Sequence, residues 1–279
     1  MQAIKTVGLI KRYKNLTAVD KLNLEIRRGE LFSLLGVNGA GKTTVIKMLS
    51  CLTKPTAGDA VVGGYSVTKE PEQVKRLMGV SPQETAVAPN LSVEENLELI
   101  CGIHGFSKEK TQAKIRELAG QLNLDTVLRR KAGKLSGGWQ RRVSIVMALI
   151  SEPQILFLDE PTLGLDVIAR HSLWDVIRSL KGKVTIILTT HYMEEAENAD
   201  RVMVMNDGVI LSDNTPKEIF KNVSQLKSVG LSVPQTTDLL SSLFELGLDV
   251  DKTLISVDAC ADSIINLLKK KGSFSFSEE

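Results

Sequence analysis

A glycine-rich segment, residues 36–43, constrains the fold of this chain more than any other feature. It reads Gly-Val-Asn-Gly-Ala-Gly-Lys-Thr and fits the pattern G-x-x-x-x-G-K-[ST]. A short, almost wholly apolar run, Leu31–Leu35, precedes it, and residues 45–49 continue in a helical pattern. Strand, loop and helix in this order are the setting in which backbone N–H groups cradle phosphate oxygens at the positive end of a helix dipole. The segment therefore predicts a phosphate-binding turn in an α/β fold.

The polar residues of that turn have predictable roles. The Lys42 ammonium is expected to neutralise the β and γ phosphates of a nucleoside triphosphate such as ATP, and the Thr43 hydroxyl to hold Mg²⁺. The residues of the segment and its helix start that are expected to contact the nucleotide are Gly36, Asn38, Gly39, Ala40, Gly41, Lys42, Thr43 and Thr44.

A second apolar run ends in two carboxylates. Residues 155–160 read Ile-Leu-Phe-Leu-Asp-Glu. A buried strand that ends this way brings a negative charge to the carboxyl edge of the sheet, where ligands bind in open α/β folds. Asp159 is then expected on the Mg²⁺ side. Glu160, one residue further, is expected to hold the attacking water, as a base or as an orienting group.

Charge and hydropathy narrow the function classes. Lys+Arg 35 against Asp+Glu 33 gives a net charge of +2, which argues against a nucleic-acid partner. The longest nearly uncharged apolar runs, residues 143–150 and 184–188, fall short of the ~20 residues that a bilayer span needs. Residues 1–13 lack the ~7–15-residue apolar core of a signal peptide. We expect a cytoplasmic chain, so any membrane span must come from another subunit.

Alternating strand and helix patterns predict the architecture. Residues 155–158 and 184–188 are short and apolar, as strands covered on both faces of a parallel sheet are, whereas residues 22–26 alternate like an edge strand. Helical patterns lie between them, one of which starts with a capping box formed by Ser92 and Glu95. We expect an α/β domain with a mainly parallel core sheet and an antiparallel β edge.

The pattern changes after residue 208. Thr215, Pro216 and Glu218 predict another helix start, with Glu218 placed to reach back to the cap. Residues 236–246 and 258–271 are helical in pattern, and an apolar stretch separates them. We place a domain boundary near residue 220, between a domain of residues 1–220 and a small appendage of residues 221–279 that is helical or α/β. This appendage is expected to pack on the main domain or on a partner.

The middle of the chain carries a family resemblance. Residues 135–140, Leu-Ser-Gly-Gly-Trp-Gln, resemble the signature motif of the ABC (ATP-binding cassette) ATPases and open a helix over 141–150. Other motifs resemble the rest of that family's set, and the similarity covers residues 3 to 220. They are Gln83 of the Q-loop, residues 162–166 of the D-loop, His191 as the switch histidine and Tyr13 as the aromatic residue that stacks on adenine.

The resemblance implies a fold and a composite site. The fold is the P-loop NTPase domain of ABC ATPases, with a helical signature subdomain at about residues 84–150. Ser136, Gly137 and Gly138 would contact the γ-phosphate of ATP held by a second subunit, so a homodimer or heterodimer is implied. Gln83 would contact Mg²⁺ and link the site to a transmembrane permease, and His191 would steady the γ-phosphate. The chain is then peripheral on the inner face of the membrane.

Two residues depart from the family pattern. Trp139 stands where the family most often has Gln, which puts a side-chain contact to nucleotide in doubt. Leu163 stands where the D-loop usually has Ser, which weakens a hydrogen bond across the dimer. Neither departure removes Lys42, Asp159 or Glu160, so an active ATPase is expected.

Three function classes compete for this resemblance. Soluble ABC proteins of translation carry two cassettes, and those of DNA repair carry a long coiled-coil insertion, whereas this chain has one glycine-rich segment and one signature. A P-loop kinase or GTPase leaves the signature and Gln83 unexplained. Among transporters, residues 36–43, 161–166 and 190–197 resemble ATPase subunits of bacterial drug or lipid exporters. Residues 215–220 and 230–234 resemble instead the tail of energy-coupling-factor importer ATPases for vitamins or metal ions, and we favour export.

Overall fold

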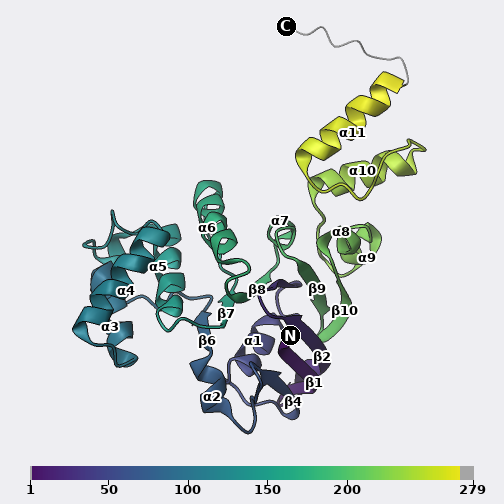
Figure 1. Cartoon of the computed structure of the whole chain (residues 1–279). Coiled ribbons are helices and arrows are strands. Elements are labelled where there is room, and N and C mark those ends of the chain that lie inside the picture. Colours follow the sequence, from purple (N-terminus) through teal and green to yellow (C-terminus); the bar gives the residue numbers. More distant parts are fainter. Residues whose placement is uncertain (1, 271–279) are drawn as a thin grey trace, which may run out of the picture.

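The computed structural model describes residues 2–270, and two sheets organise residues 2–214 (Figure 1). The larger sheet has the order β10-β9-β3-β8-β7-β6 and is parallel except at β10. Its strands are β3 (Leu31–Leu35), β6 (Met78–Ser81), β7 (Ile155–Asp159), β8 (Thr185–Thr190), β9 (Arg201–Asn206) and β10 (Val209–Asn214). The mainly parallel core sheet is thereby confirmed.

The smaller sheet is antiparallel and has the order β2-β1-β4-β5. Its strands are β1 (Gln2–Tyr13), β2 (Leu16–Arg27), β4 (Ala57–Val62) and β5 (Tyr65–Ser66). The predicted edge strand over residues 22–26 lies within β2, which is at the edge. Its buried residues Leu22, Leu24 and Ile26 alternate with exposed ones, as period-2 patterning requires.

The central strands supply side chains to a core on each side of the large sheet. Leu31 and Leu35 of β3 join the helices in one cluster, whereas Phe32 and Leu34 pack with the antiparallel sheet and the helix after the glycine loop in the other. Because successive side chains of a strand point to opposite faces, a strand covered twice must be apolar throughout. This explains the unbroken apolar runs in the sequence.

Helices connect the strands and cover the sheets. They are α1 (Lys42–Leu49), α2 (Pro71–Arg76), α3 (Val93–Ile103), α4 (Lys108–Gln121), α5 (Gly137–Leu149), α6 (Val167–Leu180), α7 (Met193–Ala196), α8 (Pro216–Phe220), α9 (Val223–Ser228), α10 (Gln235–Glu245) and α11 (Val257–Lys270), with a 3-10 turn at Ala132–Lys134. Among the helices of residues 2–270, none combines the length and apolar character that crossing a bilayer takes.

The helices α3, α4 and α5 lie together to one side of the sheets (Figure 1). The predicted capping box starts α3: Ser92 N donates to Glu95 Oε2 at 2.6 Å, and Glu95 N donates to Ser92 Oγ at 3.1 Å. This group of helices lies within the region proposed as the signature subdomain.

The predicted capping box of α8 is wrong, although the helix does start at Pro216. Thr215 makes no side-chain capping bond to any described residue. Its backbone N–H is taken instead by Asn214 Oδ1 at 2.8 Å, and the Glu218 carboxylate pairs with Lys221 at 2.6 Å. Asn214 therefore takes the N–H that Glu218 would have bonded, and Lys221 takes the Glu218 carboxylate, so the capping box does not form.

The chain after α8 packs in two places. Leu226, Leu231 and Val233 belong to the main core, whereas Leu240 forms a separate small cluster with Val250 and Cys260. The helices α10 and α11 project away from the sheets (Figure 1) and correspond to the predicted helical segments 236–246 and 258–271, of which residue 271 lies outside the described residues. The elements described in residues 221–270 are the helices α9, α10 and α11.

Candidate active site

A cleft of about 480 Å³ lies at the carboxyl ends of β3, β7 and β8. The glycine-rich segment follows β3, Glu160 follows β7 and His191 follows β8. The residues that line the cleft are Tyr13, Leu16, Ala18, Asn38, Gly39, Gly41, Lys42, Thr43, Thr44, Gln83, Glu160, Leu163 and His191. This is the edge at which α/β sheets bind ligands.

Lys42 is the buried cation of the cleft, at 5% exposure. Its ammonium donates to the backbone carbonyls of Gly36 at 2.7 Å and Val37 at 3.1 Å, and it lies 3.5 Å from Glu160 Oε1. Burial lowers the pKa of Lys42, and the negative charges of Glu160 and Asp159 oppose this. The loop carbonyls thus hold the Lys42 ammonium at the cleft, where it can bind an anion such as a phosphate group.

Two glycines of the loop are required by the backbone itself. A Cβ on Gly36 would lie 2.5 Å from the carbonyl oxygen of Met205, so the loop and the neighbouring strand could not approach as they do. Gly41 has φ +102° and caps α1, and a Cβ there would lie 2.4 Å from the Ala18 carbonyl oxygen. Gly36 and Ala40 are buried behind the cleft and shape the loop from there.

Hard oxygen donors meet beside Lys42. The Thr43 hydroxyl donates to Asp159 Oδ1 at 3.1 Å, and the Thr189 hydroxyl donates to the same oxygen at 2.6 Å. Thr189 Oγ1 also accepts from the backbone N–H of Glu160 at 2.9 Å. A carboxylate and a hydroxyl side by side are the ligand types that Mg²⁺ takes in nucleotide sites, so this donor set fits that ion.

Glu160 lies between Lys42 and His191. Its Oε1 lies 3.5 Å from Lys42 Nζ and 3.5 Å from His191 Nδ1. Its backbone has φ +46°, a conformation that residues other than glycine adopt only where the surroundings hold them. The local geometry therefore places the carboxylate between the Lys42 ammonium and the His191 ring.

Gln83 lies in the exposed loop after β6, and its side chain lines the cleft. The signature helix α5 holds this loop through Arg141, whose guanidinium donates to the carbonyl of Pro82 at 2.6 Å and to that of Gln83. Arg141 is 5% exposed, and burial lowers its pKa, opposed by Asp159. A side chain of the signature helix thus reaches the loop that carries Gln83.

The signature residues face a different pocket. Ser136 and Gly138 line a hollow of about 350 Å³ together with Trp139, Arg142 and residues of the start of α6. Ser136 is exposed at the N-cap of α5, and its side chain makes no capping bond within residues 2–270. Gly137 is exposed beside it. Of the predicted site residues, these three are the ones that one copy of the chain does not bring to Lys42.

Trp139 packs within its own chain. Its ring lies 4.7 Å from the guanidinium carbon of Arg142, and Arg142 also donates to Ser172 Oγ of α6. The tryptophan at this position of the signature is therefore accommodated by a cation–π contact within α5, whose arginine is tied to α6 through Ser172.

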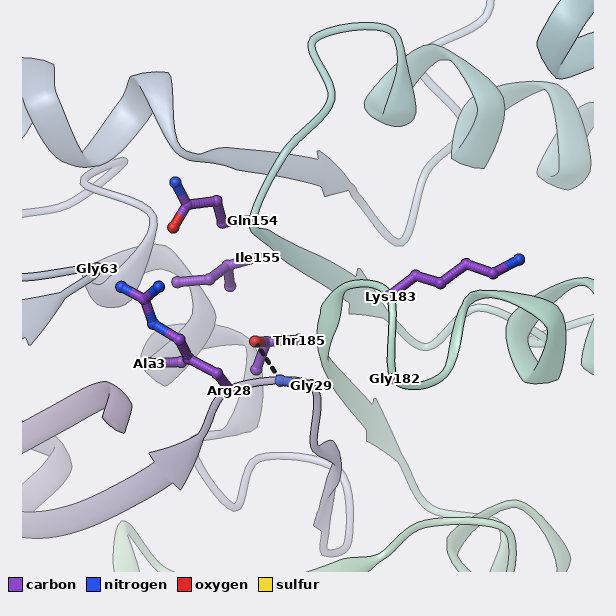
Figure 2. Close-up of a pocket in the computed structure, with 9 residues that line it drawn as sticks. All are labelled: Ala3, Arg28, Gly29, Gly63, Gln154, Ile155, Gly182, Lys183 and Thr185. Atoms are coloured by element: carbon purple, nitrogen blue, oxygen red, sulfur yellow. Dashed lines mark hydrogen bonds between the residues drawn. The ribbon is translucent and has the colours of Figure 1, made fainter. Parts of the chain in front are cut away.

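Another pocket, of about 270 Å³, lies at the opposite edge of the sheet (Figure 2). Gly29, Gln154 and Lys183 come from the segments that lead into β3, β7 and β8. Lys183 points away from Arg28 and Gln154, and the Thr185 hydroxyl accepts from Gly29 N at 3.0 Å (Figure 2). Among the described residues that line it there is no carboxylate, histidine or cysteine, so the cleft at Lys42 is the stronger candidate.

Sequence reasoning missed several residues that hold the site. Thr189 and Arg141 are the clearest, because each bonds directly to a loop or side chain that was predicted. The signal for Thr189 was available as a polar pair, Thr189 and Thr190, at the end of a buried strand. Arg141 gave no signal, because its partners lie far away in the sequence.

Comparisons with known proteins agree with this geometry. The family model described as "ABC transporter" matches residues 19–163. The doxorubicin resistance ATP-binding protein DrrA of Mycobacterium tuberculosis is 41% identical over 221 residues, which are 78% of this chain and 67% of that protein. The Nod factor export ATP-binding protein I of Burkholderia thailandensis is 40% identical over 76% of this chain and 70% of its own.

Solved structures with the same fold include other cassettes. The dimeric structure of MJ0796, described as a bacterial ABC transporter cassette, has a TM-score of 0.69 at 28% identity and covers 76% of this chain and 98% of its own. CbiO1 from Clostridium perfringens has a TM-score of 0.75 at 24% identity, covering 86% and 99%. The P-loop NTPase fold predicted from the motifs is confirmed, and the chain belongs to the ABC transporter family of ATP-binding proteins.

Proposed function

We propose that this chain is the ATP-hydrolysing subunit of an ABC exporter and that it works as a pair of ATPase subunits. One observation carries the proposal: Lys42, Glu160 and His191 converge on one cleft, while Ser136 is exposed in another pocket. In the arrangement that the ABC resemblance implies, the signature of a second subunit would complete the γ-phosphate site, and the separation of the two pockets supports this. The exposed N–H groups at the start of α5 suit an anion that another copy presents.

The residues of the cleft divide the chemistry of hydrolysis between them. The glycine-rich loop and Lys42 bind the triphosphate, and Tyr13, 42% exposed at the rim, supports the adenine. Thr43, Asp159 and Gln83 would hold Mg²⁺, which when bound offsets phosphate charge. Glu160 orients the attacking water or accepts its proton, and His191 donates to the γ-phosphate. Glu160 is placed for this role because its carboxylate is buried in the cleft beside the Lys42 ammonium and the His191 ring.

ATP acts as the link between two subunits in this proposal. The γ-phosphate carries the charge that both surfaces bind, so the closed pair forms with ATP and loosens after hydrolysis. Both a homodimer and a heterodimer of related ATPase subunits can supply these two surfaces. The apolar side chain of Ile168, 82% exposed at the start of α6, lines the pocket of the signature residues and would be covered by the partner subunit.

Transport needs a membrane partner. We place the contact with a separate transmembrane permease near Gln83 and the helical subdomain, which makes the chain peripheral on the cytoplasmic face of the membrane. Relatives named for drug resistance and Nod factor export support export, because their similarity covers three quarters of the chain. The importer alternative rests on residues 215–220 and 230–234 alone.

Two experiments test the proposal. Phosphate release from Mg-ATP should be fast for the parent chain and lost in Glu160→Gln, while Glu194→Gln, an exposed carboxylate near the site, keeps the parental rate. Pull-down from membranes in mild detergent should recover a polytopic partner that changes the ATPase rate. A parent chain without ATPase activity, or a Glu160→Gln variant that hydrolyses ATP at the parental rate, contradicts the assignment.

A further inference from the structure

A buried carboxylic acid beside the active site has no role in the chemistry described so far. Glu195 lies in α7, the short helix after His191, and is 1% exposed. Its Oε1 accepts a hydrogen bond from the Thr162 hydroxyl, and Thr162 is also 1% exposed. Burying a carboxyl group costs free energy unless a hydrogen-bond partner offsets it. The partner here is a residue of the turn that follows Glu160.

That turn holds Glu160 in an unusual backbone conformation. Glu160 has φ +46°, and its N–H is fixed by Thr189 Oγ1 at 2.9 Å on the strand side. After Glu160, the turn is closed by a hydrogen bond from Leu163 N to the Glu160 carbonyl oxygen at 3.2 Å. Thr162 lies inside this turn, and its hydroxyl donates to Glu195 of α7. Left-handed backbone at a non-glycine residue persists only where the surroundings impose it. Thr189 bonds to the Glu160 N–H directly, and Thr162 ties the turn after Glu160 to α7.

The residue that caps the same helix, Tyr192, packs against His191 and against Arg170 of α6. The rings of His191 and Tyr192 lie 4.1 Å apart, and the Arg170 guanidinium carbon lies 4.4 Å from the Tyr192 ring. Within the described residues, Arg170 Nε and Glu195 Oε2 are both buried without a hydrogen-bond partner. Glu195 of α7 thus bonds to the turn after Glu160 through Thr162 and lies close enough to Arg170 of α6 for that charge to act on it.

We propose that Glu195 is a positioning residue for ATP hydrolysis, which acts through Thr162 to fix the turn that carries the Glu160 carboxylate. This inference rests on the proposed function, because it takes Glu160 as the group that orients water. Glu195 contacts neither Lys42 nor the cleft, so nucleotide binding does not depend on it. The turn sets where the Glu160 oxygens lie, and small displacements of such a group are costly to the rate.

The charge state of Glu195 is compatible with this role. Burial raises the pKa of Glu195 to about 7, opposed by the Thr190 hydroxyl and the Arg170 charge and reinforced by Glu194 and Glu160. The carboxyl group keeps an acceptor oxygen for Thr162 whether or not it carries a proton. A glutamine at this position keeps an acceptor as well, which makes it the conservative substitution.

The test compares variants that keep or remove this hydrogen bond in the full chain. Glu195→Ala and Thr162→Val should each lower kcat by ~10-fold or more, with KM for ATP and the affinity for nucleotide within ~2-fold of the parent. Glu195→Gln and Thr162→Ser keep the bond and should retain most of kcat. The double variant Glu195→Ala/Thr162→Val should be no slower than either single one, since both remove the same interaction. Glu194→Ala, on the exposed side of α7, is the control.

Several results would overturn the inference. A Glu195→Ala variant with parental kcat excludes the positioning role, as does a Glu195→Gln variant that loses as much as Glu195→Ala. If Glu195→Ala does not fold, Thr162→Val decides the question, because valine has the shape of threonine without its hydroxyl. Failure of the proposed function looks different: the parent chain would not hydrolyse ATP, or Glu160→Gln would hydrolyse it at the parental rate.

Discussion

Lys42 Nζ lies 3.5 Å from Glu160 Oε1, and both side chains are buried at the carboxyl edge of the sheet. The pair joins the loop after β3 to the end of β7, so the phosphate-binding cation and the proposed hydrolytic carboxylate are held as one unit. Removing one partner of a buried pair leaves an uncompensated charge, which is costly. The same ammonium is expected to meet the phosphates, so Glu160 and the nucleotide share it.

Replacing Lys42 by alanine should abolish most nucleotide binding. The ammonium supplies charge-assisted hydrogen bonds to phosphate, and losing them should weaken ATP binding by at least ~10-fold. Titration with a fluorescent ATP analogue in the presence of Mg²⁺ measures this directly. Lys47→Ala, an exposed lysine of the same helix, is the matched control and should bind like the parent. Equal affinity for both variants would exclude Lys42 from the phosphate site.

Replacing Thr189 by valine should destabilise the site and slow hydrolysis. Its hydroxyl serves both Asp159 Oδ1 and the Glu160 N–H, and Thr189 is fully buried. Leaving these groups unpaired should cost ~1–3 kcal/mol in the free energy of unfolding. Denaturant unfolding measures the loss, and Thr189→Ser, which keeps the hydroxyl, should recover most of it. A valine variant as stable and as active as the parent contradicts this reading of the contact.

The stability of the chain should depend on the ionisation of Glu195. Its pKa of about 7 lies above the ordinary 4.5, so the folded state holds this proton more tightly than the unfolded state does. The contribution is complete below pH 4.5 and is lost as the pH rises to 7. Glu195→Gln cannot ionise, so its stability relative to the parent should rise over this window by up to ~3 kcal/mol, at ~1.4 kcal/mol per pKa unit. Urea unfolding of both chains at several pH values checks this, and a constant difference contradicts it.

Leu231 and Leu240 should report on two separate packing units. Leu231 belongs to the main core and lines a pocket together with Val37 and His191, whereas Leu240 belongs to the cluster of the C-terminal helices. Leu231→Ala should therefore lower the unfolding free energy of the nucleotide-binding domain by ~2–5 kcal/mol. Leu240→Ala should leave that transition and ATP affinity unchanged. Thermal unfolding with nucleotide bound distinguishes the two variants. If both lowered the stability of the nucleotide-binding domain equally, the division into two packing units would be contradicted.

The sequence predicts those parts of the molecule in which the cause is local. The loop at residues 36–43, the apolar strands β3, β7 and β8 and the cap at Ser92 each depend on a few consecutive residues, and each is formed as expected. The capping box predicted at Thr215 does not form, and the cause there is also local. Its neighbour Asn214 competes for the backbone N–H within one residue, and the pattern of the motif does not include that residue.

The supporting contacts of the site depend on the fold and could not be found in this way. Thr189 meets Asp159, Arg141 meets the loop of Gln83, and Glu195 meets Thr162 only because separate strands and helices end at the same edge of the sheet. The division near residue 220 stays a prediction. The packing of Leu226, Leu231 and Val233 on the main core favours a junction closer to α10.

The most direct test of the account is the mass of the Glu160→Gln chain in solution with bound nucleotide. Light scattering should give the mass of two chains in Mg-ATP and of one chain in Mg-ADP, because only ATP presents a γ-phosphate to Ser136 of the opposite subunit. Adding Ser136→Glu, which places a negative charge at that contact, should abolish the dimer while each chain still binds ATP. A Glu160→Gln chain that stays at the mass of a single copy with ATP bound would contradict a site shared between two subunits.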